Sequence, residues 1–254
     1  MKDIRAQVEY QKKLPGGYYR LGLKTDMNTF VPGQFGMLQV PAGQGVFLRR
    51  PFSLARQNNG ITEILYKVVG RGTENLSQVA PGAELFLLGP LGSGFSQTLK
   101  GKDLVGVAGG YGVAPFWELG AQLQSQGKTL DLFYGVRSHS DLMYLEELAK
   151  VGVRVHVATQ DGSQGFKGLV TELLDQHYPG DPPHWIGSCG PMGMLKAVGR
   201  WAELKDVSCE LSVEEVMGCG TGVCLGCVVK DREGDYLRSC IEGPVFNSKI
   251  LDLS

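Results

Sequence analysis

The sequence predicts a mixed β and α/β fold in three parts: an antiparallel β-barrel over residues 1–98, a parallel-sheet α/β domain over residues 99–207, and a small metal-centred domain over residues 208–254. Three observations support this division. Short β-rich runs separated by turns fill the first part, strand and helix patterns alternate in the second, and glycine and cysteine are concentrated in the third. A chain of 254 residues is long enough to build more than one core.

Five short runs in the first part have the alternation or the β-branched and aromatic residues typical of strands; they lie at 6–10, 18–25, 35–40, 60–69 and 83–90. Turn signals such as Pro-Gly-Gly and Asn-Asn-Gly separate them. Many short strands at close spacing predict a small antiparallel barrel.

In the second part, strand patterns alternate with helical ones. Strands are expected at 104–110, 129–136, 153–159 and 184–190, and helices at 114–127, 141–152, 168–178 and 191–204. This alternation predicts a parallel sheet covered by helices. The third part is too short to hold a core unaided, so a metal centre is expected to stabilise it.

Composition excludes several classes of protein. With 25 Lys+Arg against 26 Asp+Glu, the chain offers no general attraction for nucleic acid or for anionic lipid. The longest uncharged stretch, 27–48, contains two prolines and four glycines and would not span a membrane. The N-terminal residues are charged throughout, unlike a signal peptide, so we expect a cytoplasmic protein whose six cysteines are thiols or metal ligands.

The most specific motif is the cysteine series near the C-terminus. Cys219, Cys224, Cys227 and Cys240 have the spacing x4, x2 and x12, which is typical of a plant-type [2Fe–2S] cluster. Interleaved glycines suit a loop folded tightly around inorganic sulfide. The alternative is a structural zinc site, although zinc sites usually pair two short Cys-x2-Cys hairpins. Cys209 lies outside the spacing and is expected to be structural.

Weaker motifs in the first part suggest a bound nucleotide. Arg50-Pro51-Phe52-Ser53 begins an expected strand, Leu65-Tyr66-Lys67 ends the next, and Gly70-Arg71-Gly72-Thr73 follows. An arginine can hold a pyrophosphate, a serine hydroxyl can hydrogen-bond an isoalloxazine edge, and a glycine turn at a helix start can offer amides to phosphate. Each motif taken alone is more often an ordinary turn or a solvated strand end.

Similar signals in the second part lie at expected strand ends. A glycine turn at 107–115 leads into a helix that starts at proline, which suits a dinucleotide pyrophosphate but also suits close packing. Thr159-Gln160-Asp161 and Cys189-Gly190-Pro191 follow two further strands. Asp161 could accept a hydrogen bond from an adenosine ribose and repel a 2′-phosphate, which predicts NAD rather than NADP, whereas Arg137 could favour that phosphate. Taken alone, Cys189 is expected to be a small buried hydrophobe.

The order of these motifs resembles the ferredoxin–NADP reductase superfamily. The motifs are PGQF at 32–35, RPFS at 50–53, the Gly-x-Gly-Thr turn, GGYGVAP at 109–115, FYGVR at 133–137, Cys-Gly-Pro at 189–191 and the terminal cysteines. The LRRPFS phrase and the cysteine spacing are similar, more narrowly, to the electron-transfer subunits of type B dihydroorotate dehydrogenases. The resemblance covers essentially the whole chain.

The resemblance implies a flavin-binding barrel carrying FAD, an NAD-binding α/β domain and a [2Fe–2S] domain. It assigns Ser53 to the flavin N5 region, Arg50 to the pyrophosphate and Cys189 to the nicotinamide ring, with Ser53 and Cys189 as the catalytic residues. The remaining cofactor residues are Pro51, Phe52, Leu65, Tyr66, Lys67, Gly72 and Thr73 for FAD, Gly109, Gly110, Gly112, Pro115 and Asp161 for NAD, and the four cysteines for iron.

The resemblance further implies a catalytic partner carrying FMN, with two copies of each chain, and an electron relay from dihydroorotate through that FMN, the cluster and FAD to NAD. A related NAD(P)H reductase serving ferredoxin, an oxygenase or a sulfur-metabolising partner is the alternative, and a zinc-stabilised nucleotide-binding scaffold is a third. Two departures from the superfamily pattern are Phe52, where tyrosine is common, and Ala108 with Tyr111 in the glycine turn. Tyr111 is large enough to cover the flavin or to screen the nicotinamide pocket.

Overall fold

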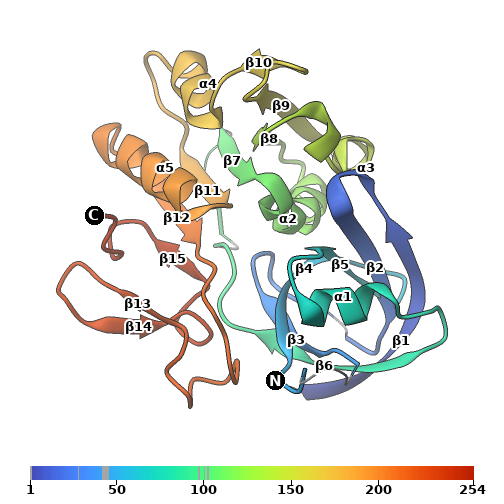
Figure 1. Cartoon of the computed structure of the whole chain (residues 1–254). Coiled ribbons are helices and arrows are strands. Elements are labelled where there is room, and N and C mark those ends of the chain that lie inside the picture. The colour runs from blue at the N-terminus through green and yellow to red at the C-terminus, as the bar shows by residue number, and fades with distance from the viewer. Residues whose placement is uncertain (1, 28, 42–45, 97, 100, 102) are drawn as a thin grey trace.

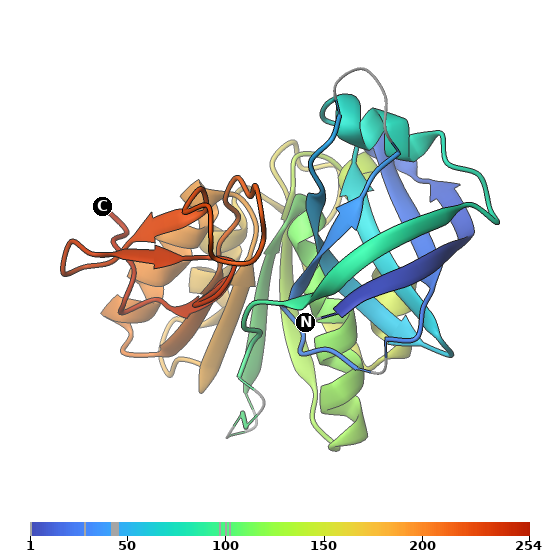
Figure 2. The same cartoon turned by 90° about the horizontal axis from the view of Figure 1, so that it is seen from below.

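A closed barrel and a helix-covered sheet lie against each other in the computed structural model, which describes residues 2–27, 29–41, 46–96, 98–99, 101 and 103–254 (Figure 1). Seen from below, the barrel lies on one side of the sheet and the C-terminal segments lie on the other (Figure 2). The expected order of an antiparallel barrel followed by a mainly parallel, helix-covered sheet is confirmed, and the bounds of the three parts stay predictions.

The barrel consists of six antiparallel strands in the order β1-β2-β5-β4-β3-β6. Their bounds are Lys2–Lys13, Tyr18–Lys24, Ile61–Lys67, Arg50–Asn58, Phe35–Gln39 and Glu84–Leu91 in that order. Alternate residues of β1, namely Ile4, Ala6 and Val8, face the buried interior, as the period of two in a strand requires. A short helix, α1 (Arg71–Ser77), lies between β5 and β6.

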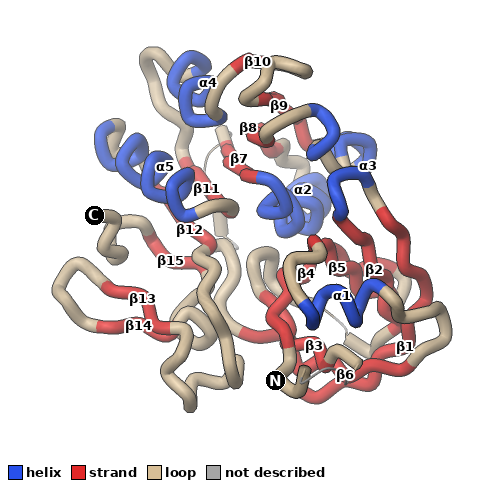
Figure 3. Tube along the Cα trace, viewed as in Figure 1, coloured by secondary structure: helices blue, strands red, loops and turns tan. Residues whose placement is uncertain are grey.

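The sheet has seven strands in the order β10-β9-β8-β7-β11-β12-β15, all parallel except β15. The strand bounds are Phe166–Lys167, Val153–Thr159, Leu130–Val136, Leu104–Gly109, Trp185–Cys189, Ser208–Ser212 and Val245–Asn247 in that order. The helices are α2 (Ala114–Ser125), α3 (Leu145–Lys150), α4 (Val170–His177) and α5 (Met192–Leu204). Figure 3 shows these helices on both sides of the sheet strands.

The two faces of the sheet bury different cores. Leu104 and Ala108 of β7 pack with α2 and with barrel residues, whereas Val105 and Val107 face α4 and α5. Because consecutive strand residues point to opposite faces, one uniformly apolar strand serves both layers.

The C-terminal part is joined to the sheet rather than standing apart. Strand β12 pairs with β11, and β15 pairs with β12, so both ends of residues 208–254 lie within the seven-stranded sheet. Leu211, Phe246 and Leu253 share a core with α5. Apolar residues of this part are therefore buried against the sheet domain, and stabilisation by a metal centre stays a prediction. We call residues 213–244, between β12 and β15, the cluster region; its hairpin strands are β13 (Val228–Lys230) and β14 (Tyr236–Arg238).

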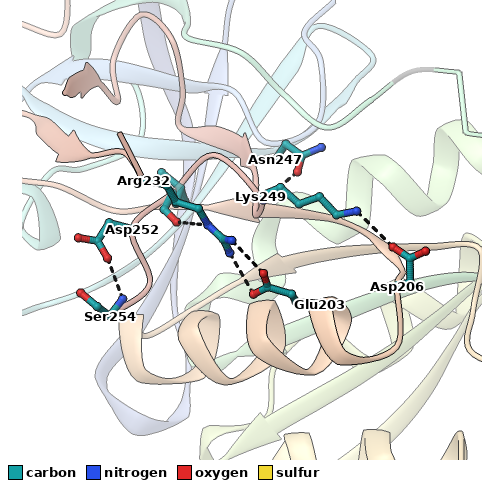
Figure 4. A network of polar contacts seen from close by, with 8 residues as sticks. Glu203, Asp206, Arg232, Asn247, Lys249, Asp252 and Ser254 are labelled. Atoms are coloured by element: carbon teal, nitrogen blue, oxygen red, sulfur yellow. Dashed lines mark hydrogen bonds and ion pairs between the residues drawn. The ribbon is translucent and has the colours of Figure 1, made fainter. Parts of the chain in front are cut away.

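Ion pairs also hold the hairpin and the C-terminus against α5 (Figure 4). Arg232 makes a two-pronged contact with Glu203, with nitrogen–oxygen distances of 2.8 and 3.0 Å. Lys249 pairs with Asp206 at 3.3 Å. These contacts are exposed, so they orient the hairpin more than they stabilise it.

Two partly buried ion pairs join the barrel to the sheet domain. Arg56 of β4 contacts Glu118 of α2 at 2.7 Å, and Arg20 of β2 contacts Glu147 of α3 at 2.9 Å. Arg20 also pairs with Glu63 of β5. These contacts tie the barrel to the helices of the sheet domain. Among the described residues, no helix is long and apolar enough to cross a membrane.

Candidate functional site

A cavity of about 270 Å³, here called the barrel cavity, opens between the barrel and the sheet. A smaller cavity of about 230 Å³ continues it past the start of α1. The nine residues expected at the flavin all line one or both of these: Arg50, Pro51, Phe52, Ser53, Leu65, Tyr66, Lys67, Gly72 and Thr73. They converge because β4 and β5 are antiparallel neighbours, so the first residues of one strand lie near the last residues of the other.

Arg50 and the turn before α1 form the end of the barrel cavity that could bind a phosphate group. A Cβ added at Gly72 would lie 2.9 Å from Arg50 Nε, so only glycine lets the guanidinium lie this close to the helix start. The Thr73 hydroxyl accepts hydrogen bonds from the amides of Val69 and Gly70 and keeps the turn closed. A guanidinium beside a helix N-terminus fits an anionic pyrophosphate.

Aromatic packing stiffens the middle of the cavity wall. Tyr66 stacks on Tyr19 with ring centroids 5.3 Å apart, and its hydroxyl donates to Gln11 Oε1 at 3.0 Å. Phe52 packs obliquely on Tyr66. Ser53, half-buried on β4, is the small polar residue expected at a flavin edge. The mixture of flat apolar wall and few polar groups fits an isoalloxazine ring.

A second and larger cavity, of about 650 Å³, lies at the carboxyl ends of the parallel strands; we call it the sheet cavity. Gly109 and Gly110 line it, as expected for nicotinamide dinucleotide residues. Gly112 and Pro115 are not among its lining residues. A Cβ on Gly112 would come 2.2 Å from the Cys189 carbonyl oxygen, so this glycine permits close packing of two strand ends. The contacts of Gly112 and Pro115 with NAD remain predictions.

The position of Asp161 does not support its expected role at the ribose. Its carboxylate accepts hydrogen bonds from the Ser163 amide at 2.9 Å and hydroxyl at 2.6 Å, and it is not among the residues lining the sheet cavity. Arg137 and Gln160 line that cavity instead. Contact between Asp161 and the nucleotide therefore remains a prediction.

Cys189 is buried at the end of β11 and is not among the residues lining either cavity. Burial, assisted by the nearby Glu214 carboxyl, raises the pKa of the thiol to about 12, so it is uncharged at neutral pH. This favours the packing interpretation, and a catalytic role for Cys189 remains a prediction.

The four cluster cysteines form two pairs. Cys224 is the cysteine that lowers the pKa of Cys219, and Cys227 is the cysteine that contributes most to raising the pKa of Cys240. Among the described residues, no three Cys, His, Asp or Glu side chains converge on one point as a single zinc ion requires. Two pairs of thiols suit two irons.

Glycines complete the fit to a cluster. Cβ atoms at Gly218 and Gly226 would lie 3.4 and 3.6 Å from Cys224 Sγ, and Gly220 and Gly222 have positive φ angles of 71° and 81°. Hydrogen bonds from Thr221 lower the pKa of Cys219 to about 6, which favours the thiolate that binds iron. The donor set and the loop therefore fit a [2Fe–2S] cluster.

Sequence reasoning missed several lining residues. Glu214, Glu215 and Met217 line the barrel cavity, and Tyr18 lines the sheet cavity. Glu214, Glu215 and Met217 lie in the segment that follows β12. Their position after a parallel strand is the feature of the sequence that could have identified them.

Family profiles match two parts of the chain. Residues 214–252 match the iron–sulfur cluster binding domain of dihydroorotate dehydrogenase B, and residues 107–200 match the oxidoreductase NAD-binding domain. A protein of Desulforamulus reducens named dihydroorotate dehydrogenase B (NAD(+)), electron transfer subunit, is 38% identical over 86% of this chain and 85% of its own length. The chain belongs to this family of electron transfer subunits. A second member, from Geobacillus, is 37% identical over 98% of both chains.

Solved structures place the family within a wider fold. A structure described as the NADH-dependent reduced ferredoxin-NADP oxidoreductase, from work on flavin-based electron bifurcation, has a TM-score of 0.87 and 25% identity; the match covers 98% of this chain and 90% of that one. A ferredoxin NADP+ reductase from Neisseria gonorrhoeae with bound FAD and NADP has a TM-score of 0.65 at 21% identity over 82% of this chain and 92% of that one. The resemblance to dihydroorotate dehydrogenase B electron transfer subunits inferred from the motifs is confirmed by the curated relatives and the family profiles.

Proposed function

We propose that the chain is the electron-transfer subunit of an NAD-linked dihydroorotate dehydrogenase, relaying electrons between a dihydroorotate-oxidising catalytic subunit and NAD. The observation that carries this proposal is that the barrel cavity adjoins both of the other sites. Phe35 lines the barrel cavity and packs in one apolar cluster with Cys227 and Cys240. Tyr111 and Lys67 line both the barrel cavity and the sheet cavity. The barrel cavity therefore adjoins both the cysteines and the nucleotide cavity.

This arrangement matches the electron chemistry. A bound flavin exchanges two electrons with nicotinamide as a hydride and single electrons with an iron–sulfur cluster, so it must lie between the two. The chain contributes geometry. Arg50 and the Gly72–Thr73 turn would hold the FAD pyrophosphate, Ser53 would orient the flavin edge, and Gly109 and Gly110 would let NAD approach the strand ends.

The exposed side of the cysteine loop supports a partner. Cys224 is exposed, and beside it Val223 and Leu225 are 82% and 60% exposed. Apolar side chains of this kind around a redox centre suit a protein interface. We propose that this surface receives the FMN-carrying catalytic subunit, in an assembly with two copies of each chain.

The proposal is tested with the purified chain alone and with its co-expressed catalytic subunit. The chain alone should oxidise NADH with an artificial dye and should not oxidise dihydroorotate, because both cavities are accounted for by FAD and NAD. The pair should couple dihydroorotate oxidation to NAD reduction. Dihydroorotate turnover by the lone chain, or a pair that couples normally after the cluster is lost, would contradict the relay.

The main rival is a related NAD(P)H reductase serving ferredoxin, an oxygenase or a sulfur-metabolising partner. This rival is supported by the similarity to the ferredoxin-NADP oxidoreductase structure, which covers 98% of the chain. NADH-dependent reduction of ferredoxin at a rate that exceeds coupling to dihydroorotate would support the rival. We also expect NAD to be preferred over NADP, and equal or better kcat/KM with NADPH would contradict that expectation.

A further inference from the structure

Tyr111 occupies the wall between the two cavities. It lies in the glycine turn after β7 and lines both the barrel cavity and the sheet cavity. Its side chain is 43% exposed, so the ring faces open space rather than a packed core. Gly110, with φ of 55°, and Gly112, packed against the Cys189 carbonyl, bring the turn close to the neighbouring strand end.

A hydrogen bond to Glu214 holds the Tyr111 side chain in this position. The hydroxyl donates to Glu214 Oε2 at 2.9 Å. Desolvation and the Glu214 carboxylate raise the pKa of Tyr111, so the hydroxyl keeps its proton and remains a donor at neutral pH. Glu214 belongs to a different part of the molecule: it follows β12 by two residues and lies in the segment that leads to Cys219.

The backbone around Glu214 is itself anchored. The Val213 amide donates to the Pro244 carbonyl at 2.9 Å, which joins the two ends of the cluster region. Glu214 also lines the barrel cavity. The acceptor is therefore fixed to the cluster region, while the donor is a side chain on a turn, so the ring is the part that can move when the hydrogen bond breaks.

We propose that Tyr111 is a gate between the nicotinamide and flavin cavities and that Glu214 holds it closed. This rests on the proposed function, because the gate matters only if a nicotinamide ring must reach a flavin in the barrel cavity. With the ring held by Glu214, the nicotinamide cannot pass the shared wall. When the hydrogen bond breaks, the ring leaves the wall and the two cavities communicate.

The gate predicts tighter nicotinamide binding when the hydrogen bond is removed. The apparent dissociation constant of a ligand equals its intrinsic value divided by the fraction of protein in the binding-competent state. Tyr111→Phe keeps the ring and removes the donor, so the open fraction rises. We expect about a tenfold fall in the Kd of a non-reducing NADH analogue, tetrahydro-NAD, the size typical of losing one hydrogen bond to a charged group.

The experiment uses the FAD-loaded, cluster-containing chain. Binding of tetrahydro-NAD is followed by the change in the flavin visible spectrum, and flavin reduction by NADH is followed by stopped flow. Tyr111→Phe and Glu214→Leu should both lower Kd and the KM for NADH, without a comparable fall in the limiting reduction rate. The double variant should match the single ones, because phenylalanine lacks the donor and leucine lacks the acceptor of the same hydrogen bond. Tyr178→Phe, on the opposite face of the sheet, is the matched control and should change neither value.

Two results would overturn the gate. If Tyr111→Phe and Glu214→Leu weaken tetrahydro-NAD binding, the ring is a platform that supports the nicotinamide. If neither variant changes Kd, the hydrogen bond does not control access. Should Tyr111→Phe fail to hold FAD, Glu214→Leu carries the same comparison. These outcomes differ from failure of the proposed function, because NADH-to-dye turnover needs no partner, whereas coupling to dihydroorotate does.

Discussion

The barrel buries an interior of its own, with Leu21, Leu54 and Ile64 fully enclosed, whereas the cluster region contributes Cys227 and Cys240 to a small apolar cluster whose other buried members, including Met37, belong to the barrel. The barrel can therefore be stabilised by hydrophobic burial, which depends on its own strands. The cluster region is positioned by its neighbours and by its cysteines. The chain thus combines a barrel that has its own hydrophobic core with a cluster region that depends on its neighbours.

The largest expected effect is the loss of the cluster from the cluster region, with the barrel left intact. Cys219→Ser, Cys224→Ser, Cys227→Ser or Cys240→Ser should each abolish cluster assembly, because each removes one of the four ligands. Cys209→Ser, in a buried strand outside the spacing, should retain it. Iron and acid-labile sulfide assays measure the result. Full iron content in any of the first four variants, or complete loss in the fifth, would overturn the ligand assignment.

A change in the barrel core should instead lower the free energy of unfolding. Leu21→Ala leaves a cavity among buried strand residues and should lower the free energy of unfolding by about 3 kcal/mol. Val223→Ala, in the exposed part of the cluster region, should leave it nearly unchanged. Denaturant titration monitored by circular dichroism compares the two. Equal losses would show that the cluster region carries as much of the stability as the barrel does.

The next largest effect on stability is expected at the ion pair that joins the barrel to the sheet domain. Glu118→Gln removes the charge that pairs with Arg56 and should cost about 2 kcal/mol, because the pair is largely shielded from solvent. Glu84→Gln, which removes an exposed contact with Arg5, is the control and should have little effect. NADH-to-dye activity should fall together with stability in the first variant. Unchanged stability there would mean that apolar packing alone holds the two bodies together.

The smallest effect is expected at the surface contacts of the hairpin. Arg232→Ala removes the two-pronged contact with Glu203 shown in Figure 4. Both groups are exposed, so we expect a shift in melting temperature smaller than in either preceding variant, disappearing at high salt. Thermal unfolding at low and high ionic strength is the measurement. A shift that persists in salt would indicate a packing role for the Arg232 side chain.

Local pattern was sufficient for the main barrel strands and for the alternating strands and helices of the sheet domain, and it predicted the cluster ligands. Neighbouring residues alone define the alternation in β1, the proline at the start of α2 and the x4-x2-x12 cysteine spacing. These features can therefore be recognised without knowledge of the tertiary contacts. The nine residues at the barrel cavity could be anticipated because they lie in short motifs on two adjacent strands.

Only the tertiary structure decided the long-range relations. It joined β12 and β15 to the sheet and brought Glu214 to Tyr111 across 103 residues of sequence. Hydrophobic period shows that a strand is buried but does not specify its neighbour, and a polar residue in a loop has no local signal for its distant partner. The contact between Tyr111 and Glu214 depends on the order of strands in the sheet, because β11 lies between β7 and β12 and brings their carboxyl ends to the same edge.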